Sequence, residues 1–232
     1  MKPILFNTPM VQAVRSNLKT ETRRLIVLPE GMSGHPVGEA NNPNNPLGFM
    51  YPGGIKRPRY LPGDILYVRE TWQYAYELDE NEQIIEGTGR YLYAADNPEP
   101  CDMWIMEDGT YRDVMPWRPS IHMPKEAARE FLLVTETTVE RLHDITIEGI
   151  RNEGIQLSPR EEICRCTWET PGCRQEPCGN RDAYLPSMYI SKFVTLWDST
   201  IKDDRYLLDS WQGNPWVWVY KFERCEKPKK VI

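Results

Sequence analysis

Short apolar runs of the kind that form β-strands, separated by long stretches rich in proline and glycine, dominate this sequence. The clearest runs are residues 65–69, 131–142 and 216–222, whose Val, Thr and aromatic residues favour strands. Strands do not alternate with long helices along the chain, and no segment repeats. We therefore expect an α+β fold built on a small mixed β-barrel with short flanking helices, rather than a doubly wound parallel sheet.

Local signals also predict where short helices begin and end. The Thr-Pro pair at 8–9 predicts a helix over residues 9–16, with Thr as its cap, and Asn17 can take the left-handed conformation that ends a helix. Thr146 is expected to cap a second short helix, which Gly154 closes. The remaining expected elements are a helix over 184–201 and strands over 4–6, 71–76 and 90–95.

We interpret three stretches as loop insertions, at about 29–62, 96–124 and 156–183. They contain loop-forming residues such as proline and glycine, and their apolar residues show no clear helical or strand periodicity. A chain of 232 residues is within the size that one elaborated domain can fill, so we expect a single domain over 1–232. Loops at the mouth of a barrel commonly add specificity. The first and third insertions are therefore expected to border the candidate site.

The charge balance restricts the class of partner. The 28 Lys and Arg residues against 34 Asp and Glu give a net charge of −6, which argues against a protein that coats a long duplex with positive charge. No apolar run approaches the ~18 residues of a membrane span, and the first residues lack the pattern of a secretory signal. We expect a cytoplasmic protein without a membrane partner, and a local basic groove is still compatible with this balance.

The densest polar cluster is the run Lys-Thr-Glu-Thr-Arg-Arg at 19–24, where the first helix gives way to a strand. Side chains alternate along a strand, so Lys19 and Thr22 can act together only if Lys19 belongs to the turn before it. A lysine amine kept neutral by partial burial can then accept the proton of a threonine hydroxyl. The alternative is a solvated strand end, with Arg24 paired to Glu21 or Glu70.

A second candidate group follows the strand at 65–69. Glu70 could accept a hydrogen bond from an exocyclic amine, and Trp72 could stack on a base. The alternative is an Arg69–Glu70 surface pair and a core tryptophan. Trp117 and Arg118 lie in a loop framed by prolines and are further candidates for substrate binding.

Four of the six cysteines lie within fifteen residues of the third insertion, at Cys164, Cys166, Cys173 and Cys178. Thiols crowded in a cytosolic loop are typical of zinc ligands. Four thiolates leave no open position for water, so the expected zinc is structural. A site with fewer cysteines, or no metal at all, is the alternative, since the spacing is not that of a paired knuckle.

Several motifs together resemble the ASCH family. The run at 19–24, read as Lys-Thr-x-Thr-x-Arg, the run Pro-Gly-Asp-Ile-Leu-Tyr-Val-Arg-Glu-Thr-Trp at 62–72, and the closing strand at 215–219 carry this resemblance, which spans nearly the whole chain. The runs at 117–124 and 142–146 are similar to ASCH proteins carried by phages and prophages. The resemblance implies a PUA-like β-barrel. The family usually has glycine two residues before the motif lysine, where this chain has Asn17, which tolerates the same backbone geometry.

The resemblance also implies a chemistry. A smaller bacterial member of the family is an amidohydrolase that removes the acetyl group from the exocyclic amine of acetylcytidine, with a Lys, a Thr three residues on and a Glu in the helix after the long strand. Those positions correspond here to Lys19, Thr22 and Glu153, and Arg24 would orient a base carbonyl or a phosphate. The expected function is therefore amide hydrolysis on a nucleoside or RNA; a non-catalytic RNA-binding or modified-nucleotide-binding module, or a ribonuclease, are the alternatives.

Overall fold

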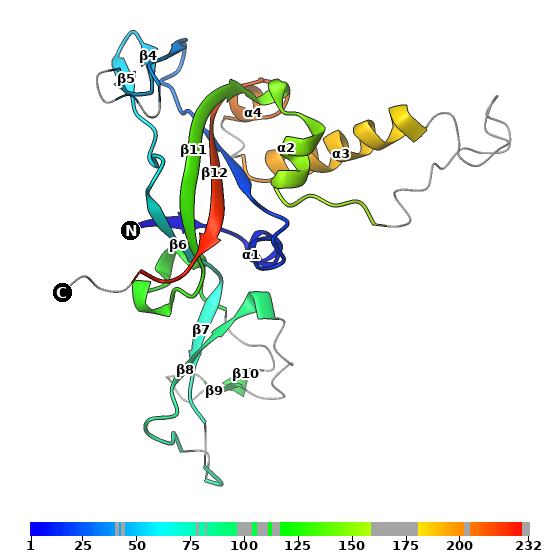
Figure 1. Cartoon of the computed structure of the whole chain (residues 1–232). Helices are drawn as coiled ribbons and strands as arrows, with labels where there is room; N and C mark the ends of the chain where they lie inside the picture. The colour runs from blue at the N-terminus through cyan, green and yellow to red at the C-terminus, as the bar shows by residue number, and fades with distance from the viewer. Residues whose placement is uncertain are drawn as a thin grey trace, which may run out of the picture. The chain divides into compact units, whose positions relative to one another are not determined.

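The structure is a computed structural model with a mixed α+β fold, mostly strands with a few short helices (Figure 1). It describes residues 1–39, 42, 45–77, 79–81, 83–96, 104–105, 111–112, 117–158, 181–201 and 205–228, of which 104–105, 111–112 and 181–184 are described by their backbone only. Among the described helices, none combines the length and the apolar character needed to cross a membrane.

The largest sheet has five strands. Its hydrogen-bonded order is β1 (Lys2–Leu5), β6 (Ile65–Arg69), β11 (Phe131–Arg141), β12 (Trp216–Cys225) and β2 (Glu21–Leu25). This order begins with β1 and ends with β2, so the described strands form an open sheet and no closed barrel. The coarse α+β class is as expected, whereas closure into a barrel is not seen in the described part of the chain.

The described residues gather into two compact units, each assembled from separate segments of the chain. The first unit contains Met1–Ser16, Asp64–Leu133 and Arg224–Ile232, and the second contains Asn17–Gly63 and Val134–Glu223.

In the first unit, β1 runs parallel to β6, with Ile4 opposite Val68, and the first residues of β11 pair antiparallel with the other edge of β6. The helix α1 (Thr8–Arg15) follows β1, and its cap is Asn7, whose side chain accepts from the Met10 N–H at 3.0 Å. The prediction of Thr8 as the cap was therefore wrong by one residue. The chain places proline near the start of the helix as expected, because its missing N–H is not needed there.

The first unit also contains a hairpin and several single turns. The hairpin pairs β7 (Trp72–Ala75) with β8 (Arg90–Tyr93), so that Trp72 lies opposite Tyr93. The first unit also contains three short 3₁₀ turns and a pair of two-residue strands, namely η1 (Ala94–Asp96), β9 (Trp104–Ile105), β10 (Tyr111–Arg112), η2 (Ser120–His122) and η3 (Lys125–Ala127). A cluster of buried side chains packs where these segments meet: Trp72, Met123, Ala127, Ala128 and Phe131.

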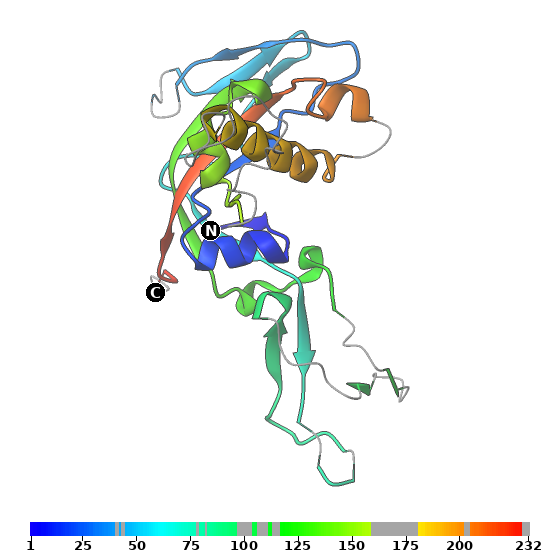
Figure 2. The ribbon, with the colours of Figure 1, turned by 90° about the vertical axis from the view of Figure 1, so that its right-hand side faces the viewer.

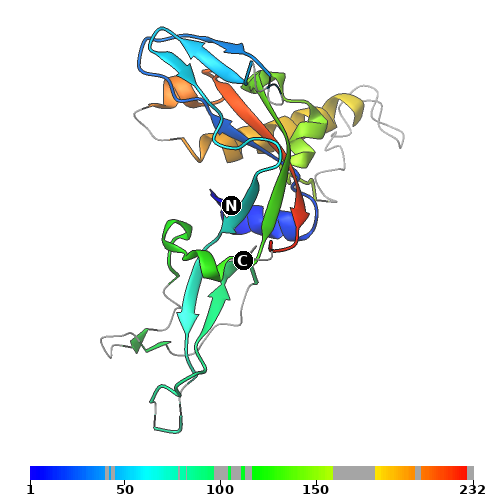
Figure 3. The same ribbon diagram turned by 60° about the vertical axis from the view of Figure 1, so that its left-hand side comes forward.

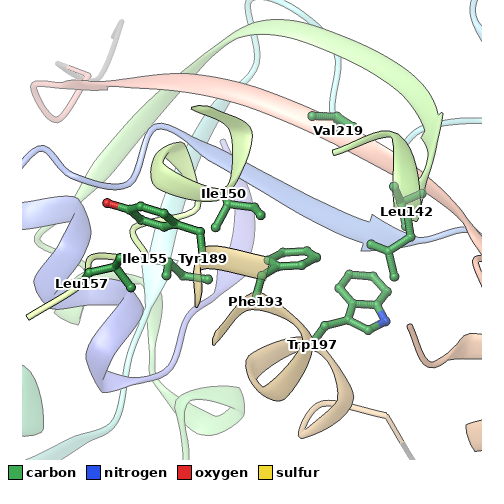
Figure 4. Close-up of a cluster of buried hydrophobic side chains, with 9 residues drawn as sticks. Leu142, Ile150, Ile155, Leu157, Tyr189, Phe193, Trp197 and Val219 are labelled. Atoms are coloured by element: carbon green, nitrogen blue, oxygen red, sulfur yellow. The ribbon is translucent and has the colours of Figure 1, made fainter. Parts of the chain in front are cut away.

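In the second unit, β12 pairs antiparallel with β2, and Val219 lies opposite Arg23. Between β11 and β12 the chain forms a 3₁₀ turn and three helices, namely η4 (Leu142–Asp144), α2 (Ile147–Asn152), α3 (Arg181–Asp198) and α4 (Tyr206–Asp209). The gold helix α3 lies alongside the short green helix α2 (Figure 2). Side chains of both helices converge with those of the strands on one apolar core, in which Phe193 and Trp197 face Leu142 and Ile150 (Figure 4).

The first insertion is not the irregular loop that the sequence predicts. Residues 29–62 contain the three-stranded antiparallel sheet of β3 (His35–Val37), β4 (Gly48–Tyr51) and β5 (Gly54–Lys56), visible as the blue-to-cyan strands in Figure 3. Strands of three or four residues with glycine and proline inside them are too short to show alternation. Phe49 is fully buried, and its ring lies 5.5 Å from that of Trp216, so this small sheet packs on the core of its own unit.

Candidate functional site

Lys19 lies between the turn at residues 16–17 and β2, in an extended bridge rather than in the turn that the hypothesis of a lysine–threonine pair requires. Asn17 has a φ of 57°, as its left-handed role predicts, and β2 begins only at Glu21. The Thr20 N–H donates to the carbonyl of Asn152 at 2.8 Å, and Lys19 forms an isolated antiparallel bridge with Glu153. The residues after the turn are thus joined to the end of α2 through the backbone.

The Lys19 side chain has no solvent exposure, and its ammonium group donates to three acceptors. These acceptors are the Glu153 carboxylate oxygen Oε2 at 2.5 Å, the Glu21 carbonyl at 2.9 Å and the Glu153 carbonyl at 3.0 Å. Burial lowers the pKa of Lys19 below its ordinary value, because removal from water disfavours the charged form more than Glu153 favours it. A lysine with a lowered pKa gives up its proton at a lower pH than one at the surface.

Glu153 is the residue with which α2 ends, and local chemistry accounts for its position. The Thr146 hydroxyl caps the helix by accepting from the Gly149 N–H at 3.0 Å, and Gly154 follows with a φ of 91°. Both features are as predicted. The Glu153 carboxylate is 6% exposed and reaches back to Lys19. The structure therefore brings together Lys19 and Glu153, two residues far apart in the sequence.

Thr22 and Arg24 lie on the opposite face of β2 from Glu21 and Arg23, because side chains alternate along a strand. Thr22 is 2% exposed and lies opposite Tyr220 of β12. Within the part of the chain that the structure describes, its hydroxyl takes part in no hydrogen bond. A hydroxyl that is not already bound to protein can be directed at a ligand.

Two tyrosines share this face. The Tyr60 and Tyr220 rings meet edge to face at 4.9 Å, and the Tyr220 hydroxyl accepts from the Arg59 N–H at 3.2 Å. Burial raises the pKa of Tyr220 to about 12, so the phenol keeps its proton at neutral pH. Burial also lowers the pKa of Arg24, although the nearby Glu153 opposes the change. The face therefore combines hydroxyl groups with one guanidinium.

The two acids suggested as partners of Arg24 have other contacts. The Glu21 carboxylate accepts from the Asn152 amide at 3.0 Å and lies 3.6 Å from Arg23. The Glu70 carboxylate, only 1% exposed, accepts two hydrogen bonds from Arg129, each 2.9 Å long. The suggested Arg69–Glu70 surface pair is likewise not what the structure gives, since Arg69 donates to the Met123 carbonyl at 2.8 Å.

The remaining predicted binding residues form a group in the first unit. Trp72 and Arg118 exchange two backbone hydrogen bonds, of 3.2 and 2.8 Å, and the Arg118 guanidinium lies 5.6 Å from the centre of the Trp72 ring. Trp72 itself is 6% exposed and belongs to the core cluster of that unit, as the alternative interpretation proposed. Trp117 is half-buried and Arg118 is exposed. Lys19, Thr22, Arg24 and Glu153 belong to the second unit.

The predicted zinc ligands Cys164, Cys166, Cys173 and Cys178 lie outside the described residues. Among the residues that are described, no cluster of three or more His, Cys, Asp or Glu side chains is arranged to hold a metal ion. The zinc site stays a prediction. Elemental analysis of the purified protein would test it, with about one equivalent expected and lost in Cys173→Ser.

Arg23 is the functional neighbour that the sequence did not single out. Its backbone N–H donates to Glu153 Oε1 at 2.6 Å, and its guanidinium donates to Glu140 at 2.7 Å. Strand alternation already puts Arg23 on the same face as Glu21, but only the fold shows that α2 covers that face.

Comparisons of the chain with protein-family models, with curated proteins and with solved structures find no match.

Proposed function

We propose that this chain is an ASCH-like protein with a PUA-like fold that hydrolyses the amide of an N-acylated pyrimidine nucleoside, free or within RNA. The ASCH resemblance supplies the substrate class and the trio Lys19, Thr22 and Glu153. The observation that supports the proposal most directly is the 2.5 Å contact between Lys19 and Glu153, because the motifs alone aligned Glu153 only through short local matches.

The chemistry of the proposal divides the work among these three residues. The Thr22 hydroxyl oxygen attacks the acyl carbon, its proton passes to the Lys19–Glu153 pair, and the pair returns a proton to the leaving exocyclic amine as the C–N bond breaks. Water then hydrolyses the acyl-threonine ester, which releases the carboxylic acid and restores the hydroxyl. Proton return is needed because an amine leaves poorly as an anion.

In this proposal Arg24 orients the base carbonyl or a phosphate from the same strand face as Thr22. The first-unit residues take smaller parts. Both Glu70 oxygens already accept from Arg129 and Trp72 is a core residue, whereas Trp117 is half-buried and Arg118 exposed, so the last two are kept as the candidates for binding RNA.

A second candidate function is a binding module without catalysis, and one observation favours it. All three protons of the Lys19 ammonium are directed to acceptors within the protein, and the side chain is fully buried. A lysine held in this way stabilises the turn that presents Thr22 and Arg24, whether or not it transfers protons. No residue of the described part of the chain specifically favours the ribonuclease alternative.

The decisive experiment uses Thr22→Val, which removes the hydroxyl and keeps the shape of the side chain. Because that hydroxyl has no hydrogen bond within the described residues, the variant should fold as well as the wild type. Mass spectrometry follows a mixed pool of acylated nucleosides and short RNAs. Wild type should release the deacylated nucleoside and the free acid, Thr22→Val should be slower by about 100-fold or more, and the exposed Thr20→Val is the matched control.

Each other outcome points to an alternative. A wild type that changes no member of the pool, but melts at a higher temperature with one of them, is a binding module. RNA fragments without deacylation indicate a ribonuclease. Equal rates for Thr22→Val and wild type would exclude Thr22 as the nucleophile.

A further inference from the structure

The Glu153 carboxylate is held at both oxygens by different partners. Oε2 contacts Lys19 at 2.5 Å, whereas Oε1 receives the Arg23 backbone N–H at 2.6 Å and lies 3.4 Å from the Arg23 guanidinium. A carboxylate rotated partway about its terminal bond would lose the contacts to Arg23, because only one orientation and its equivalent half-turn satisfy both partners. The contact between β2 and the end of α2 thus assigns one carboxylate oxygen to Lys19 and the other to Arg23.

We propose that Arg23 is a positioning residue, which holds Glu153 Oε1 so that Oε2 alone exchanges a proton with Lys19, and that Gly149 makes room for it. This inference rests on the proposed function, because it assigns a role to Arg23 in the Lys19–Glu153 proton transfer. Arg23 acts through Glu153, on the strand face away from Thr22.

The Arg23 guanidinium is itself fixed by its neighbours. Its Nε donates to Glu140 at 2.7 Å, and Nη2 lies 3.6 Å from Glu21, whose other carboxylate oxygen accepts from Asn152 at 3.0 Å. The Arg23 side chain is 3% exposed and the Glu140 side chain 25%, so the guanidinium itself is largely shielded from water. A donor held from several sides loses little freedom when it supports Glu153, which is what preorganisation requires.

Gly149 explains why the guanidinium can lie where it does. A Cβ atom at this position would stand 2.9 Å from Arg23 Nη2, closer than side-chain carbons normally approach. Gly149 lies inside α2, where glycine is disfavoured relative to alanine, and its backbone conformation does not demand glycine. The close approach of the Arg23 guanidinium therefore explains why this position holds a glycine.

The same arrangement affects Lys19 electrostatically. The charged groups that act on Lys19 are Glu153, which favours the ammonium form, and Arg23 and Arg24, which disfavour it. Removal of the Arg23 charge should therefore raise the pKa of Lys19. Arg23→Lys restores a positive charge and should bring the pKa of Lys19 partly back toward its wild-type value. The return is partial because lysine lacks the planar array of N–H donors that arginine provides.

The test combines Gly149→Ala, Arg23→Gln and Arg23→Lys in the full chain, with the exposed Glu148→Ala on the same helix as the control. The titration of the Lys19 side chain is followed by NMR, and the pH profile of kcat/KM by deacylation of acetylcytidine. Gly149→Ala should lower kcat/KM by about tenfold or more, since displaced groups cost rate, whereas the preference of alanine for the helix offsets part of what the displacement of Arg23 costs in melting temperature. Arg23→Gln should move the Lys19 titration and the pH profile upward, with partial rescue by Arg23→Lys.

The inference is overturned if Gly149→Ala and Arg23→Gln change only the melting temperature and leave the Lys19 titration as in the wild type. Failure of the proposed function gives a different result, namely a wild type that deacylates nothing. The NMR titration needs no substrate, so it still decides whether Arg23 controls Lys19 in that case.

Discussion

A network of ion pairs around Glu153 in the second unit and another around Arg129 in the first unit differ mainly in their access to water. In the second unit, the side chains of Lys19, Arg23 and Glu153 are at most 6% exposed. In the first unit, Glu70 is buried to a similar degree, but its partner Arg129 is 24% exposed and Asp96 beyond it is 38% exposed. Similar pairs of charged residues thus carry different energetic weight, because water screens the Arg129 pairs more than the Lys19–Glu153 pair; the Arg23–Glu140 pair lies between them, with Glu140 25% exposed.

The first-unit network is organised around Arg129. Its guanidinium binds Glu70 with two hydrogen bonds, contacts Asp96 at 2.7 Å and lies 3.8 Å from the centre of the Tyr93 ring. Although partial burial disfavours the charge, the hydrogen bonds to Glu70 and Asp96 raise the pKa of Arg129. This network fastens η1 and the end of β6 to the start of β11, which is a structural task, whereas the second-unit network surrounds the candidate reactive groups.

The largest effect is expected for Glu153→Gln. This change leaves the Lys19 ammonium buried without a carboxylate, which should cost about 3–5 kcal/mol of the free energy of unfolding, measured by urea denaturation. The double variant Lys19→Met, Glu153→Leu removes both charges and should recover most of that loss. A cost below about 1 kcal/mol for Glu153→Gln alone would mean that water reaches the pair.

Glu70→Gln should have an intermediate effect. The amide keeps one hydrogen bond to Arg129, and the exposed side of the guanidinium can turn to water, so we expect a loss of about 1.5–3 kcal/mol in the same assay. A loss as large as that of Glu153→Gln would show that partial exposure of Arg129 does not relieve the unpaired charge, and would remove the contrast between the two networks.

Asp96→Asn should cost less, about 0–1 kcal/mol, because this carboxylate is exposed. The hydrogen bonds from Arg129 and Arg15 lower the pKa of Asp96, although burial alone would raise it. A carboxyl with a lowered pKa contributes stability above its unfolded value of about 3.9, and loses it as the pH falls through the folded value. Wild type and Asp96→Asn should therefore differ at pH 7 and converge in acid; a difference that grows in acid would contradict the sign.

The smallest effect is expected for the exposed Lys221–Glu136 pair, in which both side chains are 48% exposed and 2.8 Å apart. Lys221→Met should change stability by at most about 1 kcal/mol at low salt, and by nothing measurable at 1 M salt, where the screening length is about 3 Å. The cost of Glu153→Gln should persist at 1 M salt. Equal salt sensitivity in both variants would count against the buried position of the Lys19 pair.

The sequence predicts well those features that local chemistry determines. The strand at 65–69 has the predicted bounds, Thr146 caps α2, and Asn17 adopts the left-handed conformation before Lys19. In each case the information lies within a few residues, in a run of apolar side chains, a capping hydroxyl or a residue that tolerates positive φ. The helix cap at Asn7 was misplaced by one residue because Thr8 and Asn7 are both good caps.

Features that depend on distant segments could not be read in the same way. The paired hydrogen bonds between Glu70 and Arg129 join the end of β6 to the start of β11. The contact of Arg23 with Glu153 forms only when α2 packs against β2. The sequence did not predict the sheet within the first insertion, because its strands are too short to show an alternating hydrophobic pattern. The Lys19–Glu153 contact was anticipated only through the family resemblance, since no spacing in the sequence connects the two residues.

The pairing of β2 with β12 has a consequence for the ribosome-bound chain. The strand that contains Thr22 and Arg23 is synthesised before its hydrogen-bonding neighbour in the sheet. That neighbour, from Val217 to Lys221, follows all the other helices and strands named above. Contacts so far apart in sequence form slowly. Until then the edge of β2 is unpaired and the charged residues beside it are exposed to water, so the candidate site is unassembled and other chains, or a chaperone, can pair with this strand.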